Sequence, residues 1–342
     1  MKIANLNIGE NYPPAIIAEI GINHNGSLDV AKHMVDQAIK AGADIIKHQT
    51  HFVEDEMTDE AKLTIPPNDK RSIWQIMDDC SLSPEDEINL KDFTEKLGGT
   101  YISTPFSRKA AIFLNDIGVP AFKIGSGECC NLPLIRLIAS FGKPIIMSTG
   151  MHSVEEIKPA VDIFEENQIQ YALLECTNLY PSPPENVSLK GITELKNNFP
   201  NAVIGFSDHS LGPYMALSSI PLGARIIERH FTDSMDRDGP DIICSMNPEE
   251  LKVIKKRSKE IFIASRNKKQ KTKEEEDVLN FARSSVVADK EIKKGQTISA
   301  EDVWARRPGT GEIPGSEFDK VIGKTALKDL SFNQQIKWSD LK

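Results

Sequence analysis

Eight short apolar runs, each followed by a segment with helical spacing, recur along the first 230 residues. The runs are Ala15–Glu19, Asp44–Lys47, Thr100–Ser103, Ala121–Ile124, Pro144–Ser148, Tyr171–Glu175, Ala202–Phe206 and Arg225–Glu228. Strands that alternate with helices favour a parallel sheet, and eight such units are the number that closes into a barrel. The sequence therefore predicts the α/β class, with a (β/α)8 TIM barrel.

The intervening segments carry helix signals of their own. Between the first two runs, apolar residues within Leu28–Ile39 recur at the spacing of one helix face, with Ser27 before them and Gly42 after them as caps. Ser153–Glu156 has a cap residue followed by an acid three positions later, which is typical of a helix start.

The chain has 342 residues, more than a single core usually accommodates, because cores rarely grow past about 250–300 residues. We expect a catalytic barrel over residues 1–267, a charged linker over 268–282 and a small domain over 283–342. The small domain should contain short strands and one helical turn. Its size makes it marginal alone, so we expect it to dock on another surface.

The charge and the cysteines exclude several classes of protein. Lys and Arg total 41 against 50 for Asp and Glu, and this net charge of −9 gives no general attraction for nucleic acid or an anionic membrane. Neither a signal-peptide pattern nor an apolar run of about 18 residues is present. The five cysteines form no CxxC pair, which favours a reducing, cytoplasmic location. We expect Cys129, Cys130 and Cys176 to be packed thiols rather than nucleophiles.

Polar residues end every predicted strand, where barrels of this type build their active sites. Lys47 and Lys123 end the second and fourth runs, and hydroxyl-bearing residues end several others. Ammonium groups attract a multiply charged anion, while hydroxyl and backbone donors fix its oxygens. Phosphoenolpyruvate, which carries a phosphate and a carboxylate, is a ligand that suits such a set of strand ends.

Two histidines, His209 and His230, follow neighbouring predicted strands, and this spacing can bring both imidazoles to one metal ion. Glu228, Asp208 and Glu19 lie nearby in the predicted topology. Mixed nitrogen and oxygen ligands with open positions favour Mn²⁺ or Mg²⁺ as a Lewis acid.

At these residues the sequence resembles the bacterial sialic acid synthases, or N-acetylneuraminate synthases. The segments AEIGINHNG, IIKHQTH, ISTPFSR, FKIGSGE, STGM, TNLYP, FSDHS, ERHF and DRDGPDIICSM follow the order of that family's pattern. The tail from Ser284, with VWARRPGTGEIP, is similar to the family's antifreeze-like SAF domain, a β-clip. The resemblance implies a domain-swapped homodimer in which each tail covers the partner's barrel.

The resemblance also implies roles for individual residues. Phosphoenolpyruvate would be held by Lys47, Thr104, Lys123, Ser126, Ser148, Asn178 and Ser207. A divalent metal, Mn²⁺ with Mg²⁺ or Co²⁺ as alternatives, would be bound by His209 and His230. An open-chain N-acylated amino sugar would be contacted by Glu19, Tyr180 and Asp241, and by Arg307 of the partner subunit or, one position away, Arg306.

The implied reaction joins phosphoenolpyruvate to N-acetylmannosamine and water, giving N-acetylneuraminate and phosphate by C–O cleavage. Lys47 and Lys123 would stabilise charge on the departing group, and Glu19 and Glu128 are the candidates for moving protons. A legionaminic or pseudaminic acid synthase, acting on a diacylamino-trideoxy-hexose, is the alternative within this reaction class. A non-catalytic carbohydrate- or ice-binding protein is the alternative outside it.

Overall fold

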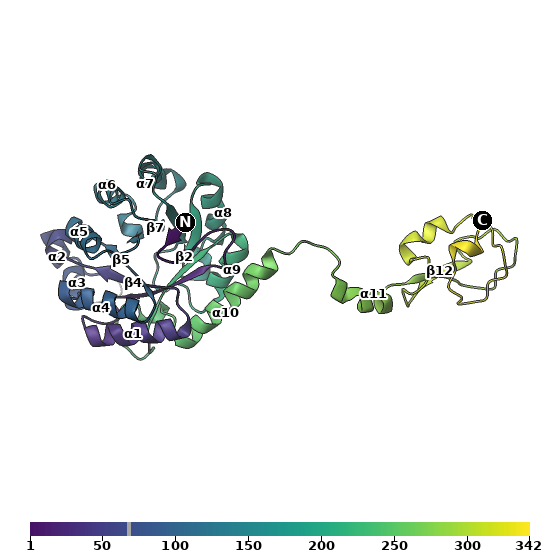
Figure 1. Ribbon diagram of the computed structural model, residues 1–342, viewed down its shortest axis with the longest axis horizontal. Coiled ribbons are helices and arrows are strands. Elements are labelled where there is room, and N and C mark those ends of the chain that lie inside the picture. The colour runs from purple at the N-terminus through teal and green to yellow at the C-terminus, as the bar shows by residue number, and fades with distance from the viewer. Residues whose placement is uncertain (67–69) are drawn as a thin grey trace. The chain divides into compact units, whose positions relative to one another are not determined.

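A closed barrel of eight parallel strands forms the centre of the larger part of the molecule (Figure 1). The computed structural model describes residues 1–66 and 70–342. The barrel strands are β3 (Ala15–Gly21), β4 (Ile45–Thr50), β5 (Thr100–Pro105), β6 (Phe122–Ile124), β7 (Ile145–Ser148), β8 (Tyr171–Cys176), β9 (Val203–Ser207) and β10 (Ile226–His230). They pair in sequence order, and β10 closes the barrel against β3. The predicted TIM barrel is confirmed.

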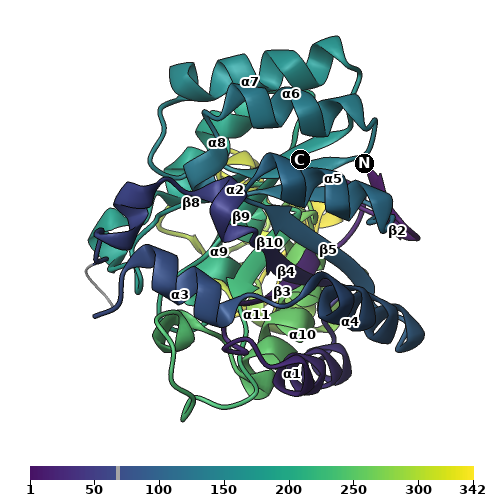
Figure 2. The same cartoon turned by 90° about the vertical axis from the view of Figure 1, so that its left-hand side faces the viewer.

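Helices surround these strands (Figure 2). They are α1 (Leu28–Ala41), α2 (Val53–Glu56), α3 (Ile73–Cys80), α4 (Pro84–Lys96), α5 (Arg108–Asp116), α6 (Leu132–Ser140), α7 (Val154–Glu166), α8 (Leu189–Asn198), α9 (Tyr214–Leu222) and α10 (Pro248–Ser265). The predicted caps are present, because Ser27 begins α1, Gly42 ends it in the left-handed region, and Ser153 and Glu156 form a capping box on α7. The main apolar core lies between the helices and the outer faces of the strands.

The inside of the barrel is divided into an apolar layer and a polar layer. Side chains that point inward near the start of the strands are apolar, and they include Ile17, Ile45, Ile102, Ile146, Leu174 and Ile226. The same core contains Ile3 and Ile8 of an N-terminal hairpin, β1 (Lys2–Ile3) with β2 (Leu6–Asn7), which the sequence analysis did not predict. Because side chains alternate along a strand, the next inward positions toward the carboxyl ends share this face, and they are polar. The polar layer is where the site lies.

A second compact unit comprises Lys268–Lys342, and Met1–Asn267 form the first. Its core is built around β11 (Ser285–Ala288) and its antiparallel partner β12 (Val303–Arg306), with short 3-10 turns at Gly315–Lys320 and Trp338–Asp340. The residues expected to be a linker contain a helix, α11 (Glu276–Ala282). In the described part of the chain, no helix has both the length and the apolar character needed to cross a membrane.

Candidate active site

A cavity of about 130 Å³ lies at the carboxyl ends of the barrel strands, within the polar layer. Its walls contain all seven residues expected to hold phosphoenolpyruvate, together with Tyr180 and both histidines. The lining residues are Lys47, Gln49, Thr104, Phe106, Lys123, Gly125, Ser126, Gly127, Ser148, Cys176, Asn178, Tyr180, Ser207, His209, Glu228 and His230. Segments separated by almost two hundred positions in the sequence thus meet in one small volume.

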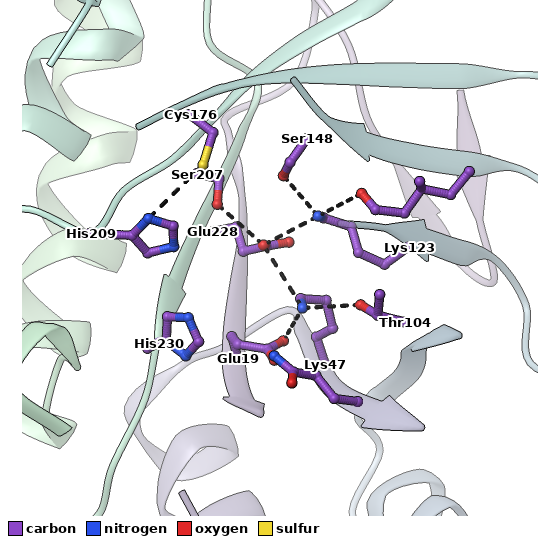
Figure 3. Close-up of polar contacts among 12 residues, drawn as sticks. Glu19, Lys47, Thr104, Lys123, Ser148, Cys176, Ser207, His209, Glu228 and His230 are labelled. Carbon is purple, nitrogen blue, oxygen red and sulfur yellow. Dashed lines mark hydrogen bonds and ion pairs between the residues drawn. The ribbon is translucent and has the colours of Figure 1, made fainter. Parts of the chain in front are cut away.

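Four buried charged side chains form a chain (Figure 3), and Lys47, Lys123 and Glu228 of this chain line the cavity. Glu19 pairs with Lys47, and the Lys47 ammonium lies 3.9 Å from Oε1 of Glu228. The same oxygen lies 3.5 Å from Nζ of Lys123. Two cations and two anions therefore alternate, and each lysine is paired with a carboxylate as a buried charge requires.

Each lysine also donates to a hydroxyl group. Nζ of Lys47 donates to Thr104 over 3.2 Å, and Nζ of Lys123 donates to Ser148 over 2.7 Å. Burial lowers the pKa of Lys123. Burial also acts to lower the pKa of Lys47, but Glu19 and Glu228 offset this effect and the pKa is raised. The neighbouring carboxylates thus favour the charged form of Lys47.

The turn after β6 contributes further groups to the cavity wall. Ser126 opens the 3-10 turn η2 (Ser126–Glu128), and its hydroxyl accepts a hydrogen bond of 3.1 Å from the Gly150 amide. A Cβ atom at Gly150 would lie 2.0 Å from Oδ1 of Asn178 and 2.9 Å from the Cys176 carbonyl. Glycine at this position is therefore what lets the ends of β7 and β8 approach each other.

The two predicted metal ligands lie side by side, with their ring centroids 5.4 Å apart. Nδ1 of His209 lies 2.8 Å from the Thr177 carbonyl, which can only accept, so Nδ1 carries the proton and Nε2 keeps a free lone pair. Nδ1 of His230 is buried without a hydrogen bond, and Asp241 Oδ2 lies 3.9 Å away. Burial lowers the pKa of both histidines, which favours the neutral form that binds metals.

This donor set fits a divalent ion that takes its remaining ligands from substrate or water. Among residues 1–66 and 70–342, no three His, Cys, Asp or Glu side chains are grouped so as to hold an ion alone. Open positions distinguish a catalytic metal site from a closed structural one. His209 and His230 would hold the ion, with the Thr177 carbonyl orienting the first imidazole.

Three predicted residues of the barrel unit lie outside the cavity wall. Asp241 lies beside His230, and burial raises its pKa to about 6. Glu19 forms an ion pair with Lys47, and Oε1 of Glu19 also accepts a hydrogen bond of 2.9 Å from the Gln49 side-chain amide. Glu128 is partly buried in η2, and its carboxylate accepts from the Asn131 amide over 2.5 Å.

The structure distinguishes the two arginines of the second unit. Arg306 pairs with Asp289, donates to Asn333 and lies over the Phe332 ring. Arg307 is exposed and makes no ion pair, hydrogen bond or ring contact with any described residue. Of the two, Arg307 is the one whose guanidinium is available to a ligand.

Several residues at the site were not assigned from the sequence, notably Gln49, Phe106 and Cys176. Gln49 follows Lys47 by two positions on β4, so the alternation of a strand places both on the inner face. That signal could have identified it. The expectation of a packed Cys130 is wrong, because Cys130 is exposed while the other four cysteines are buried.

Comparisons with known proteins show which family models and chains this one is similar to. The NeuB family model matches residues 34–270, and the SAF domain model matches residues 283–342. The chain is 35% identical to the N,N'-diacetyllegionaminic acid synthase of Campylobacter jejuni, over 94% of this chain and 98% of that protein. It is 34% identical to the pseudaminic acid synthase of the same organism, over the full length of both.

Among solved structures, the N-acetylneuraminic acid synthetase of Leptospira borgpetersenii in complex with citrate superposes with a TM-score of 0.74. The sequences are 31% identical, and the match covers 82% of this chain and 94% of that one.

Proposed function

Because this chain belongs to the NeuB family, we propose that it condenses phosphoenolpyruvate with an open-chain N-acylated amino sugar and water. The products are a nine-carbon sialic-type acid and phosphate. The observation that carries the proposal is the polar layer of the barrel, where Lys47 and Lys123 lie among hydroxyl groups in the cavity at the strand ends. Such a layer provides both the charge and the directed donors that a phosphate and a carboxylate need.

The reaction requires negative charge to be stabilised on a leaving phosphate. C3 of phosphoenolpyruvate bonds to the aldehyde carbon, water adds at C2, and the bond between C2 and the bridging oxygen then breaks. Lys47 and Lys123 hold the phosphate and carboxylate and stabilise the charge that grows on the departing oxygen. A Mn²⁺ ion bound by His209 and His230 would supply a Lewis acid for the aldehyde oxygen.

Proton transfer must accompany these steps, because the aldehyde oxygen gains a proton and the attacking water loses one. Glu19 adjoins Lys47 at the edge of the cavity, and Asp241 lies beside His230. Glu19 pairs with a lysine of the cavity wall, whereas Glu128 is hydrogen-bonded to Asn131, so Glu19 is our first candidate for proton transfer and Glu128 the second. Tyr180, whose ring lies 4.2 Å from that of His209, would position the sugar.

The direct test is turnover by the purified chain with Mn²⁺, phosphoenolpyruvate and a panel of amino sugars. Phosphate release and the mass of the product identify the accepted sugar. Phosphoenolpyruvate with ¹⁸O at the bridging oxygen should give labelled phosphate, because the C–O bond breaks. Label retained in the nine-carbon product, or no product with any sugar, would contradict the proposal.

Two candidate sugars follow from different observations. The sequence resemblance favours N-acetylmannosamine, which would give N-acetylneuraminate. The relatives named as N,N'-diacetyllegionaminic acid and pseudaminic acid synthases favour a diacylamino-trideoxy-hexose. The ratio of kcat/KM for the two sugars, measured in competition, decides between them.

We further propose that the active enzyme is a domain-swapped homodimer in which Arg307 serves the partner's barrel. The support is an exposed Arg307 without partners in its own unit, on a domain that forms a separate compact body. A guanidinium can donate to the acyl carbonyl of the sugar. The closed two-fold pairing would then complete two sites.

Mixing two inactive variants tests this arrangement. After dissociation and reassociation, Lys123→Met combined with Arg307→Ala should recover activity toward about half the wild-type value per heterodimer, because one composite site carries both lesions and the other neither. Each variant taken through the same treatment alone is the control. Absence of recovery despite demonstrated heterodimers would mean that each tail serves its own barrel.

A further inference from the structure

An exposed thiol lies beside an imidazole just behind the cavity wall. Sγ of Cys130 lies 3.5 Å from Nδ1 of His152, and the Glu156 carbonyl is a second acceptor at 3.8 Å. All five cysteines of the chain lie in its described part, and Cys130 alone among them is exposed. Thiol reagents should therefore reach Cys130 first.

The other face of the imidazole is fixed by the backbone. Nε2 of His152 lies 3.0 Å from the Ser126 carbonyl, which can only accept, so Nε2 carries the proton. In the neutral ring Nδ1 is then the acceptor, and it faces the Cys130 sulfur. A nucleophile, a base within reach and a third group that orients the base are the parts of an activated nucleophile.

Both residues are held in place by helix starts. Cys130 directly precedes Asn131, the N-cap of α6, and His152 directly precedes Ser153, the N-cap of α7. The capping hydrogen bonds fix the backbone at both positions, so the pair is preorganised rather than carried on a free loop.

We infer that Cys130 and His152 form a thiol–disulfide exchange site that takes low-molecular-weight disulfides. The Cys130 proton passes to His152 as the sulfur attacks one sulfur of the disulfide. A new S–S bond forms to Cys130 and the original S–S bond breaks. The other half leaves as a thiolate and takes the proton from His152, so that no other reactant is needed.

The remaining cysteines give a contrast within the same chain. Burial raises the pKa of the Cys129 thiol to about 12 and that of Cys244 to about 12. Such thiols stay protonated near neutral pH, and the thiolate is the nucleophile. Cys129 adjoins Cys130 in the sequence, but Cys129 is buried and Cys130 is exposed.

The site connects to the cavity through Ser126. This residue lines the cavity, accepts from the Gly150 amide with its hydroxyl and accepts from His152 with its carbonyl. A group attached to Cys130 removes the thiol donor to His152 and displaces the ring, which releases the η2 turn. This second half of the inference rests on the proposed function, because it takes Ser126 as part of the phosphoenolpyruvate site. We expect the KM for phosphoenolpyruvate to rise about tenfold, the effect of losing about one good hydrogen bond.

The experiment measures the reaction of the full chain with oxidised glutathione and with an aromatic disulfide that releases a coloured thiolate. In the wild-type protein, one thiol per chain should react fast with the disulfide, and this fast phase should be absent in Cys130→Ser. His152→Gln can still donate to the Ser126 carbonyl but has no imidazole, and it should slow the fast phase by at least about tenfold. Cys130→Ser combined with Ser140→Cys supplies a matched exposed thiol, because the Ser140 hydroxyl contacts the Leu137 carbonyl and no imidazole in the described residues. It should react as slowly as His152→Gln.

The outcomes separate the two halves of the inference. Equal rates in wild type and His152→Gln, or a fast phase that persists in Cys130→Ser, would overturn the exchange site. Fast exchange with an unchanged KM for phosphoenolpyruvate after modification of Cys130 would overturn the link to the cavity. If unmodified protein turns over no sugar while the fast thiol remains, the proposed function fails and the exchange site stands.

Discussion

Replacing Lys123 with methionine should reduce kcat/KM for phosphoenolpyruvate by about 10²–10³-fold, the cost of removing one preorganised group that stabilises developing charge. Lys123 is 98% buried and its ammonium donates to Ser148, so no solvent cation takes its place. Calorimetry with phosphoenolpyruvate alone should also show weaker binding, because the ammonium attracts the bound anion before the reaction. Lys158→Met, which removes an exposed lysine paired with Asp162 on α7, is the matched control and should bind normally.

A loss of folding must be separated from a loss of binding in that variant. In Lys123→Met, the lysine that still pairs with Glu228 is Lys47, at 3.9 Å. Breaking a buried ion pair lowers the free energy of unfolding by about 3–5 kcal/mol. Adding Glu228→Gln removes the stranded charge and should restore much of the thermal stability, but not the binding. Unchanged affinity for phosphoenolpyruvate in a folded Lys123→Met protein would make this lysine structural.

Removal of the metal should abolish turnover completely, and Mn²⁺ should restore it. The prediction rests on neutral, buried His209 and His230, which lie side by side with the first oriented by the Thr177 carbonyl. Mn²⁺ affinity, followed by the loss of the free-ion electron paramagnetic resonance signal, should fall more than about 100-fold in His209→Gln and in His230→Gln, beyond the range seen for outer-shell partners.

An exposed histidine provides the control for the metal experiment. His33→Gln on α1 replaces a side chain that is 57% exposed and should leave Mn²⁺ affinity unchanged. Full activity in excess chelator, or tight Mn²⁺ binding by both histidine variants, would contradict the metal assignment.

The barrel could be predicted from the sequence because each of its strands is an apolar run of ordinary length between helix signals. The observed strands differ from the predicted runs by one or two residues at most ends. The N-terminal hairpin was not predicted, because β1 and β2 have two residues each, too few to show the alternation of apolar and polar residues that marks a strand. The bounds of the helix α11 could not be predicted, because the charged run before it suits both a solvated linker and a helix, and propensity decides weakly between the two.

The site residues were predictable where a strand end and its inward face are both evident in the sequence. Lys47, Lys123 and Ser148 are of this kind, and the structure brings them to one cavity. Phe106 lies on a loop beyond β5, where no periodicity applies. The His152 contact with the Ser126 carbonyl joins two loops, and no pattern along the chain predicts such a contact.

The pairing of the first barrel strand with the last has a consequence for synthesis of the chain. Ala15 pairs with Ile226, so a contact that spans about 210 residues closes the barrel, and such distant contacts are slow to form because of the entropy of loop closure. During translation β3 therefore keeps one edge unpaired until β10 has left the ribosome. Ile3 and Ile8 also cannot be fully buried before β10 is made, because the apolar layer that buries them includes Ile226. The newly made barrel thus exposes a strand edge and apolar side chains until β10 has been made, and surfaces of this kind favour aggregation.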